Sequence, residues 1–355
     1  MSPLSTIDRI EALRSVPLFA ALRWRGLGPL ACARALLRHA VALISFSWAV
    51  IRCPSVIILG RDAAYHAAAA ALNRVGGLQT VVLTNSNYSA QALWMWALPG
   101  RRYRTHMVWY SQNSVPVVYA DDPVDIPLPN FRFITVDETW VWTEGFRVFL
   151  EKLGCRGRYH VVGPILWYLP EASISLRTST GDDEIRIAVF DVTPVRDEVG
   201  AHLGLICNYY RTANMVRFIE DIVYACAQTE RATGKRVRIL LKHKRSYVST
   251  RDPRYIALIE KLSGPGQAIE LVSPETNIYS FASSCDLTLV IPYSSPVHVA
   301  VSCGRPAIFY DPTMEVQPVY EVHPLLKFIV GRENLEKALL KILNTGQHEA
   351  RLHQQ

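Results

Sequence analysis

Residues 271–313, LVSPETNIYSFASSCDLTLVIPYSSPVHVAVSCGRPAIFYDPT, alternate between short apolar runs and amphipathic stretches separated by proline, glycine and serine. The apolar runs 287–291 and 307–310 have the length of buried strands, and the stretches 276–283 and 297–302 have the spacing of short helices. Strands that alternate with helices form a parallel sheet, because each helix carries the chain back to the starting edge. The stretch therefore predicts an α/β fold.

The same alternation continues along most of the chain. In the second half we expect further strands at 185–190, 236–241 and 269–271, and helices at 211–233, 253–263 and 334–343. In the first half we expect strands at 55–59, 80–83, 105–110, 139–142 and 159–162, and helices at 62–74, 90–96 and 144–153.

The alternation is interrupted at 163–184, where Gly163, two prolines and a tail rich in Ser, Thr, Gly and Asp are typical of a linker. A chain of 355 residues is long enough for two domains. We expect Rossmann-like domains at 1–165 and 185–355, joined by a linker at 166–184.

Composition and charge exclude several classes of protein. Half of the residues are hydrophobic and 19% are charged, which excludes a disordered or fibrous chain. The net charge is +7, but residues 1–110 hold 12 arginines and three acids, a net +9, while the rest of the chain is at −2. Because the excess is regional, a nucleic-acid partner is disfavoured.

The seven cysteines show neither a CxxC pair nor a metal-type spacing. They are typical of reduced thiols in a cytoplasmic protein. Asp8 and Glu11 precede every apolar run, so we expect no signal peptide.

The longest apolar run is AVALISFSWAVI, at 40–51. It has about twelve residues, fewer than the roughly 20 that a membrane-spanning helix needs. The nearby arginines and tryptophans are Arg23, Trp24, Arg25, Arg34, Arg38, Trp48 and Arg52. We expect a helix that touches an anionic membrane surface through Arg34, Arg38 and Trp48. The alternative is a helix packed on its own domain with solvated arginines.

Three strands of the second half lead into a hydroxyl residue followed by proline: Thr193-Pro194, Ser273-Pro274 and Ser295-Pro296. A hydroxyl at the N-cap and a proline at the first helical position start a helix whose N–H groups point outward, which suits an anion. The pattern is best around Ser294 and Ser295, which we expect to hold a phosphate. Ordinary helix capping is the alternative.

The cations Lys242, Lys244 and Arg245 follow the apolar strand RILL, together with His243. Fixed cations at a strand's carboxyl end would hold phosphate oxygens and stabilise a departing nucleotide. A solvated basic turn is the alternative. Glu275 and Tyr310 are further candidates for nucleotide contacts, although the chain has neither a GxGxxG motif nor a Walker lysine loop.

Three carboxylates are candidates for catalysis. Asp191 ends the strand IRIAVF and is a candidate base or nucleophile. Glu138 and Glu144 lie around the strand TWVWT, although Glu144 also suits an ordinary helix N-terminus. His160, His243 and His298 are weaker candidates, because a lone histidine beside an apolar strand is usually structural.

Polar loops follow three strands of the first half, at 60–61, 85–87 and 111–113. Ligands of open α/β sheets bind at the carboxyl ends of strands, so these loops are candidates for acceptor contacts. Ordinary turns are the alternative.

Several segments together resemble the GT-B glycosyltransferases that build bacterial surface polysaccharides, capsule and lipopolysaccharide. They are VWTEGFRVFLEKLG (141–154), HVVGP (160–164), IAVFDVTP (187–194), LLKHKR (240–245) and the run 271–313. The resemblance covers about residues 55–343. It implies two Rossmann-like domains with parallel sheets that face each other across a cleft. It also implies a nucleotide-sugar donor on residues 185–330 and a lipid-linked or polysaccharide acceptor on the first domain.

The resemblance also implies that no metal is needed, as is general for GT-B enzymes. The pairs Asp121-Asp122 and Asp182-Asp183 lie in predicted loops and form no DxD-type metal motif. The Glu-rich donor signature of many retaining GT-B enzymes is missing. A CMP-linked acidic sugar, such as Kdo or a sialic acid, therefore stays open beside a UDP- or GDP-linked hexose.

We therefore expect a cytoplasmic glycosyltransferase, peripheral at the inner face of the cytoplasmic membrane. Two other classes stay open. A nucleotide-sugar epimerase of GT-B shape would need the same donor site but neither an acceptor nor a membrane face. A non-catalytic partner subunit would keep the fold and tolerate replacement of its carboxylates.

Overall fold

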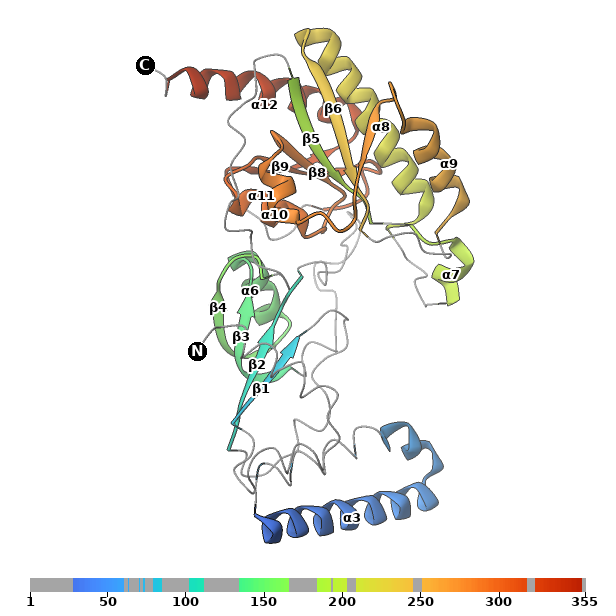
Figure 1. Ribbon diagram of the computed structural model, residues 1–355, viewed down its shortest axis with the longest axis vertical. Coiled ribbons are helices and arrows are strands. Elements are labelled where there is room, and N and C mark those ends of the chain that lie inside the picture. The colour runs from blue at the N-terminus through green and yellow to red at the C-terminus, as the bar shows by residue number, and fades with distance from the viewer. Residues whose placement is uncertain are drawn as a thin grey trace. The chain divides into compact units, whose positions relative to one another are not determined.

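The computed structural model describes residues 28–60, 63, 70, 73, 79–84, 102–111, 134–165, 184–192, 194–202, 209–244, 251–317 and 323–352 (Figure 1). The chain divides into two compact units. The first consists of Met1–Val108, Leu128–Trp140 and Leu150–His160, and the second of Trp109–Pro127, Val141–Phe149 and Val161–Gln355.

Most of a four-stranded sheet of order β1-β2-β3-β4 belongs to the first unit. Its strands are β1 (Thr80–Thr84), β2 (Arg104–Val108), β3 (Thr135–Val141) and β4 (Arg156–Val161). β1 pairs in parallel with β2, and β2 with β3. Helix α6 (Glu144–Lys152) connects β3 to β4 and buries Phe146 and Leu150. Four of these expected strands and the helix at 144–153 are thus confirmed.

The first unit also contains the long helix α3 (Pro29–Arg52) and the 3-10 helix η1 (Pro54–Leu59). The strand expected at 55–59 is therefore wrong. A short apolar run fits a strand or a helical turn equally well by periodicity, and Pro54 at the first helical position favours the turn here.

The second unit contains a six-stranded parallel sheet of order β10-β9-β8-β5-β6-β7. Its strands are β5 (Glu184–Phe190), β6 (Arg236–Lys242), β7 (Ile269–Val272), β8 (Leu287–Val290), β9 (Ala307–Asp311) and β10 (Leu326–Val330). Its helices are α7 (Asp197–His202), α8 (Thr212–Thr233), α9 (Pro253–Leu262), α10 (Ile278–Ser283), α11 (Pro296–Ser302) and α12 (Arg332–Leu352).

Helices cover both faces of this sheet. Residues of α8, α9 and α12 pack on one face, where Ile187 and Leu241 are buried. Residues of α10 and α11 pack on the other, where Ala188 and Phe190 are buried. Because both faces are covered, the central strands carry consecutive buried residues, as in β8 and in the last four positions of β5. Such runs are the pattern that predicted these strands.

The α/β class with two parallel sheets is confirmed. β10 and α7 were not expected. β10 is a half-buried edge strand, and Lys327 interrupts its apolar run. The helices expected at 62–74 and 90–96 lie wholly or mostly outside the described residues, as does the linker up to residue 183.

Candidate functional site

The strand order of the second unit marks a position where ligands commonly bind. From β5 the chain proceeds to β6 and β7 on one side, and from β8 to β9 and β10 on the other. Open α/β sheets bind ligands outside the carboxyl ends of the strands at such a switch point. Phe190 pairs with Val290, so the loops that begin at Asp191 and Ile291 start side by side.

Asp191 is the centre of a hydrogen-bonded group at this edge of the sheet. Its Oδ2 accepts hydrogen bonds from His243 Nδ1 at 2.6 Å and from the Tyr255 hydroxyl at 3.0 Å. Its Oδ1 accepts one from the backbone N–H of Lys244 at 2.7 Å. The donors come from the end of β6 and from α9. We call Asp191, Lys242, His243, Lys244 and Tyr255 the Asp191 cluster.

Within the cluster the imidazole, and not the carboxylate, reaches the surface. The Asp191 side chain is 0% exposed and that of His243 is 12% exposed. Direct contact of Asp191 with a reacting carbon, as expected from the sequence, does not agree with this burial. Asp191 instead orients His243, whose Nε2 meets no partner among the residues described. Burial and the Asp191 charge raise the pKa of Tyr255, which therefore stays protonated and keeps donating.

The predicted cations are placed differently from one another. Lys242 is buried, and its ammonium donates to the Pro274 carbonyl. Burial lowers the pKa of Lys242, while the charges of Glu275 and Asp191 oppose this shift. Lys244 is exposed, and Arg245 lies outside the described residues. Glu275 is exposed in the loop after β7, and its backbone N–H donates to Ser273 Oγ.

The loop after β8 has an unusual backbone at Tyr293. Its φ of 64° lies in the left-handed region, which an aromatic residue rarely adopts. The Tyr293 hydroxyl donates to the Gln317 carbonyl, and the Ser294 N–H donates to the Ile291 carbonyl at 3.3 Å. Backbone strain of this kind persists only where surrounding contacts hold it, and it is common at ligand sites. The loop contains Ser294, which is buried, and Ser295, and it follows the strand next to the one that leads into Asp191.

Ser295 is the N-cap of α11 and Pro296 follows it, as predicted. Its side chain, however, makes no cap hydrogen bond. The Ser295 hydroxyl lies 3.1 Å from the hydroxyl of Ser111, which the second unit also contains. The capping alternative therefore does not account for the Ser295 side chain.

Tyr310 does not line this edge. Its side chain is buried in the core, and its hydroxyl donates to Asp221 at 2.6 Å. The nucleotide contact expected of Tyr310 does not agree with this position. The signal was misleading because Tyr310 immediately precedes the carboxyl end of β9, where strand residues alternate between the two covered faces.

The other two predicted carboxylates lie in different surroundings. Glu138, on β3, accepts a hydrogen bond from His160, and this bond lowers the pKa of Glu138, aided by the charge of Arg158. The His160 ring stacks on Trp140 at 4.4 Å between centroids. Glu144 is exposed in the first turn of α6 and pairs with Arg147, whose hydrogen bond lowers the pKa of Glu144. A catalytic role for either carboxylate stays a prediction.

His298, on α11, is a buried histidine of a different kind. Its ring lies edge-on to Trp142 and Phe309, at centroid distances of 6.2 and 6.1 Å. Burial lowers the pKa of His298 to about 3. The imidazole is therefore neutral at physiological pH and is not a proton donor there.

The residues expected at a membrane lie on α3. Arg34, Arg38 and Trp48 are all exposed, and the Arg52 guanidinium lies 5.1 Å from the centroid of the Trp48 ring. By length and composition α3 is able to cross a membrane, the one helix in the described part of the chain that is. The helix, with 24 residues, is longer than the apolar run of about twelve on which the expectation rested, so the length of the run does not by itself exclude a span.

Sequence reasoning missed Tyr255, which reaches Asp191 from 64 positions away. No local motif marks it. In the described residues, no three His, Cys, Asp or Glu side chains gather so as to hold a metal ion. The pairs Asp121-Asp122 and Asp182-Asp183 lie outside those residues.

A family model described as "Polysaccharide biosynthesis PFTS motif protein" matches residues 43–339. No curated protein matches the chain in sequence.

Three solved structures are similar at low identity. TarM of S. aureus, crystallised with UDP, is 10% identical with a TM-score of 0.39, over 71% of this chain and 46% of TarM. The pneumococcal O-GlcNAc transferase GtfA is 13% identical with a TM-score of 0.43, over 81% and 54%. A protein of Listeria monocytogenes described as a UDP-N-acetylglucosamine 2-epimerase is 12% identical with a TM-score of 0.45, over 81% and 70%. The chain thus spans about half the length of TarM and GtfA.

Proposed function

We propose, because the chain belongs to the polysaccharide biosynthesis PFTS motif family, that it is a glycosyltransferase acting on a nucleotide-sugar donor. The acceptor would be a lipid-linked or growing surface glycan, of the capsule or lipopolysaccharide type. Family membership places the chain in polysaccharide biosynthesis. The observation that carries the reaction is the Asp191 cluster, in which a buried carboxylate orients an imidazole at the switch point of a doubly wound sheet.

The name of the family supports the choice of the loop after β8. The segment Pro292-Tyr293-Ser294-Ser295 fits the letters P-F-T-S residue by residue: proline, an aromatic residue, a hydroxyl residue and serine. No other segment of the 355 residues has this pattern. The loop with left-handed Tyr293 is thus the part of the chain that best fits the motif, and it lies beside Asp191.

In the proposed reaction the bond from the donor's anomeric carbon to the phosphate oxygen breaks. The nucleotide leaves with the electron pair, the acceptor oxygen bonds to the carbon, and the acceptor's proton passes to the phosphate oxygen that leaves. His243 donates a hydrogen bond to the departing phosphate through Nε2, and Asp191 stabilises the imidazolium. Lys244 adds positive charge, and the hydroxyls of Ser294 and Ser295 hold phosphate oxygens.

Lys242 has a supporting role in this proposal. Its ammonium is already bonded to the Pro274 carbonyl and faces Asp191 and Glu275. It therefore supplies charge close to the phosphate and fixes the loop after β7, where Glu275 is the proposed nucleotide contact. No metal is required in this scheme, because lysine and imidazolium supply the positive charge.

The charge distribution supports a location of the enzyme at a membrane surface. The excess of +9 on residues 1–110 lies away from the proposed donor residues in sequence, so it suits an anionic membrane or acceptor better than the nucleotide. We place the enzyme in the cytoplasm, peripheral at the inner face of the cytoplasmic membrane, with Arg34, Arg38 and Trp48 in contact with lipid.

A nucleotide screen tests the donor site. Thermal shifts are measured with CMP, UDP, GDP and dTDP on the full chain and on His243→Gln and Ser295→Ala. His323→Gln is the matched control, because His323 is exposed and precedes β10 at the opposite edge of the sheet. We expect one preferred nucleotide, a reduced shift in both site variants and an unchanged shift in the control.

The outcomes separate the classes. A flat response to all four nucleotides would reject the donor site, and preference for CMP would indicate an acidic sugar. Nucleotide release that needs no glycan acceptor and yields an isomerised sugar would indicate an epimerase. Binding without turnover, unaffected by His243→Gln, would indicate a non-catalytic subunit. Turnover that survives EDTA is expected, and its loss would reject the metal-free scheme.

A further inference from the structure

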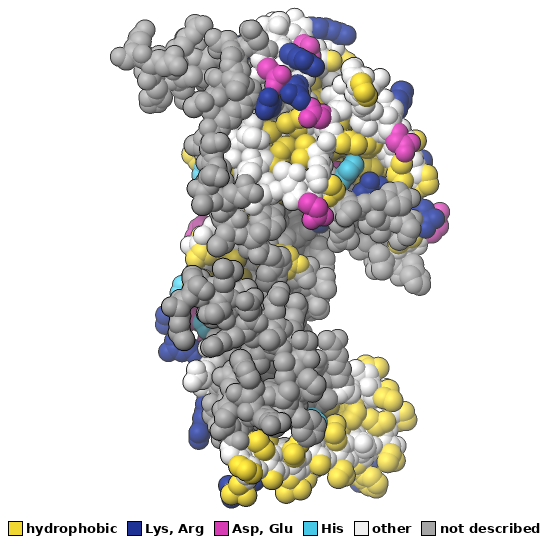
Figure 2. Space-filling view, viewed as in Figure 1, with side chains coloured by type: hydrophobic (Ala, Val, Ile, Leu, Met, Phe, Trp, Pro, Cys, Tyr) yellow, Lys and Arg dark blue, Asp and Glu magenta, His cyan; other side chains and the backbone are white. Residues whose placement is uncertain are grey.

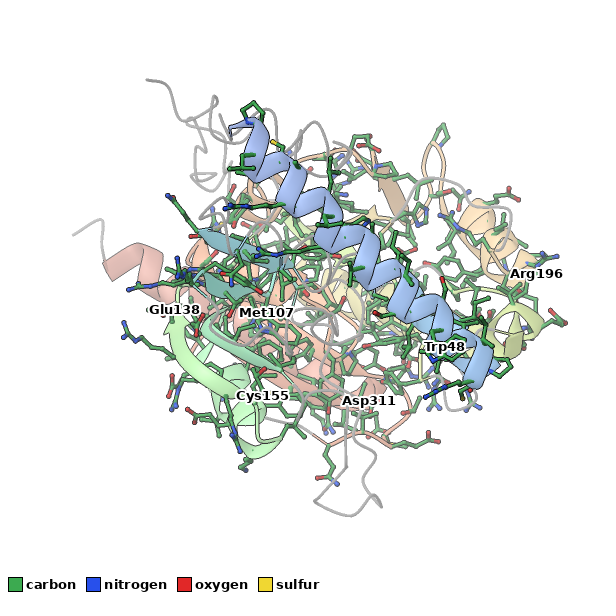
Figure 3. The ribbon with its side chains drawn as sticks, turned by 90° about the horizontal axis from the view of Figure 1, so that it is seen from below. Trp48, Met107, Glu138, Cys155, Arg196 and Asp311 are labelled. Atoms are coloured by element: carbon green, nitrogen blue, oxygen red, sulfur yellow. The ribbon has the colours of Figure 1, made fainter. Side chains whose placement is uncertain are left out.

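One face of α3 carries an apolar stripe. It consists of six of the seven large exposed hydrophobic side chains of the helix and leaves out Leu43; the six are Leu30, Leu37, Val41, Ile44, Trp48 and Ile51. They recur every three, four or seven residues, which places them on one face of a helix. Figure 2 shows hydrophobic side chains gathered on this part of the molecule, and Figure 3 shows Trp48 on α3. Soluble surfaces rarely leave such a stripe uncovered.

Helix η1 extends this surface. Its Ile57 and Ile58 are 65% and 80% exposed. The chain turns back after Arg52, so that a Cβ at Gly60 would lie 3.5 Å from the Phe46 ring. η1 therefore runs back beside the last turns of α3, and the two helices form one hook with an apolar outer surface. We call α3 and η1 the N-terminal hook.

The charged residues of the N-terminal hook indicate which kind of partner binds its apolar surface. Residues 28–60 contain Arg34, Arg38 and Arg52 and no Asp or Glu. Arg34 lies within the stripe, between Leu30 and Leu37, and Arg52 lies over the Trp48 ring. A face that combines apolar side chains with arginine and an indole ring is complementary to an anionic lipid surface. A protein partner would have to supply acidic groups among apolar ones at the same spacing.

The arginines and the turn decide how the hook meets the bilayer. Between Arg38 and Arg52 the uncharged stretch is about 20 Å long, shorter than the roughly 30 Å hydrocarbon core. If α3 spanned with its ends in the two headgroup regions, Arg38 would lie inside that core, where a charged side chain is costly. A span placed so that Arg38 reaches the headgroups would instead draw the turn at Cys53 and part of η1 into lipid, where irregular backbone groups find no partners.

We infer that α3 and η1 lie together in the plane of one leaflet of an anionic membrane, with both ends of α3 on the same side. This inference deepens the membrane contact of the proposed function by naming the inserted surface and its orientation. The apolar stripe and η1 enter the headgroup boundary, and Arg34, Arg38 and Arg52 reach lipid phosphates. The hook thereby holds the enzyme where a lipid-linked acceptor is found.

Cysteine labelling tests the orientation. Cys53 is exposed after α3, and Gly28 is exposed before it with open space for a side chain. Inverted inner-membrane vesicles are prepared from cells that express the wild type, Cys53→Ser or Gly28→Cys/Cys53→Ser. A membrane-impermeant maleimide is added with and without detergent. We expect full labelling at both positions before detergent. Labelling at one end only until detergent is added would overturn the inference in favour of a span.

Vesicle flotation tests the surface. The full chain is floated with phosphatidylglycerol-containing vesicles and with neutral phosphatidylcholine vesicles. We expect Ile44→Ser/Ile58→Ser to weaken binding to anionic vesicles at least tenfold. Leu271→Ser, an exposed apolar residue on β7, should bind as the wild type does. Equal loss in both variants, or no vesicle binding by the wild type, would overturn the inference.

A second copy of the chain is the competing occupant. If Ile44→Ser/Ile58→Ser converts a dimer to a monomer in sedimentation and leaves vesicle binding unchanged, the surface is a subunit interface and the inference is overturned. The nucleotide shift is measured on the same samples. A normal shift with failed labelling rejects the hook alone, and a flat shift with normal labelling rejects the donor site alone.

Discussion

Asp191 and Asp311 are two buried aspartates of one sheet, the first just after β5 and the second at the end of β9, yet their surroundings differ in kind. Asp311, labelled in Figure 3, accepts hydrogen bonds from the Tyr209 hydroxyl at 2.5 Å and from the N–H groups of Thr313 and Val316 at 2.8 and 3.0 Å. Asp191 accepts one from an imidazole that is partly exposed. The first carboxylate closes a loop, and the second orients a titratable group toward solvent.

This difference shows that burial of a carboxylate does not by itself indicate chemistry. The donors to Asp311 are two backbone N–H groups, the hydroxyl of Thr313 and that of the buried Tyr209, so these bonds fix the path of residues 311–316. For Asp191 the informative partner is His243, because its other nitrogen is left for a ligand. We therefore expect substitutions around Asp191 to affect turnover and substitutions around Asp311 to affect the free energy of unfolding.

The largest effect is expected for His243→Gln. It removes the imidazolium while keeping a side chain of similar reach, so turnover should fall by about 10²–10⁴-fold. The measurement is nucleotide release from the preferred nucleotide sugar, with His323→Gln as the control. Asp191→Asn should act in the same direction, since an amide orients the imidazole differently. A turnover within twofold of the wild type would remove His243 from the mechanism.

Asp311→Ala should give the largest loss of stability. The Tyr209 hydroxyl and two backbone N–H groups would be left buried without their acceptor, at a cost of about 3–5 kcal/mol in the free energy of unfolding. Urea denaturation followed by circular dichroism measures this. At low temperature the fraction that remains folded should still bind nucleotide. If binding is lost while stability is retained, the contrast between the two aspartates fails.

Acid should destabilise the second unit through His298. Its pKa of about 3 in the folded protein lies below the usual value of 6.5, so the unfolded chain binds more protons between these values. The stabilisation is complete above about pH 6.5 and decreases as the pH falls toward 3. By pH 4.5 the free energy of unfolding should drop by about 2–3 kcal/mol. His298→Asn should flatten this dependence and His323→Gln should not; identical profiles for all three would contradict the assignment.

The smallest effects distinguish the two tyrosines. Tyr209→Phe removes one donor to Asp311 and should cost about 1.5–3 kcal/mol of stability, with normal nucleotide release. Tyr255→Phe should cost a similar amount and also reduce turnover several-fold, because His243 is then held less firmly. If turnover by Tyr255→Phe has the same pH profile as turnover by the wild type, Tyr255 is structural only. The pH–rate profile is the deciding measurement.

The parallel strands were predictable because both faces of the second sheet are covered. Leu287–Val290 is buried at every position, and such runs stand out in a sequence. The run at 54–59 is equally apolar but exposed, and it forms η1 instead of a strand. Local composition does not distinguish these cases, because the deciding factor is whether another strand lies alongside. The family match confirms the predicted place in polysaccharide biosynthesis.

The sequence predicted the segments that form the site, but not the hydrogen bonds between their side chains. The segments containing Asp191, Lys242 and Ser295 were recognised because they follow apolar strands. The hydrogen bond between Asp191 and His243 depends on the pairing of β5 with β6. The hydrogen bond from Tyr255 to Asp191 depends on how α9 packs. These are tertiary facts, so the roles of Asp191 and His243 could not be ordered correctly from spacing alone.

The left-handed backbone at Tyr293 limits how this loop can diverge in evolution. A β-branched residue there would be strained, and glycine would lose the ring that lies 6.4 Å from that of Phe309. Phenylalanine, the residue named in the motif, would keep the ring and forgo the hydrogen bond to Gln317. Exchange between tyrosine and phenylalanine at this position therefore removes or adds one hydrogen bond and leaves the path of the loop intact. The backbone geometry can thus be kept while the sequence of the loop changes.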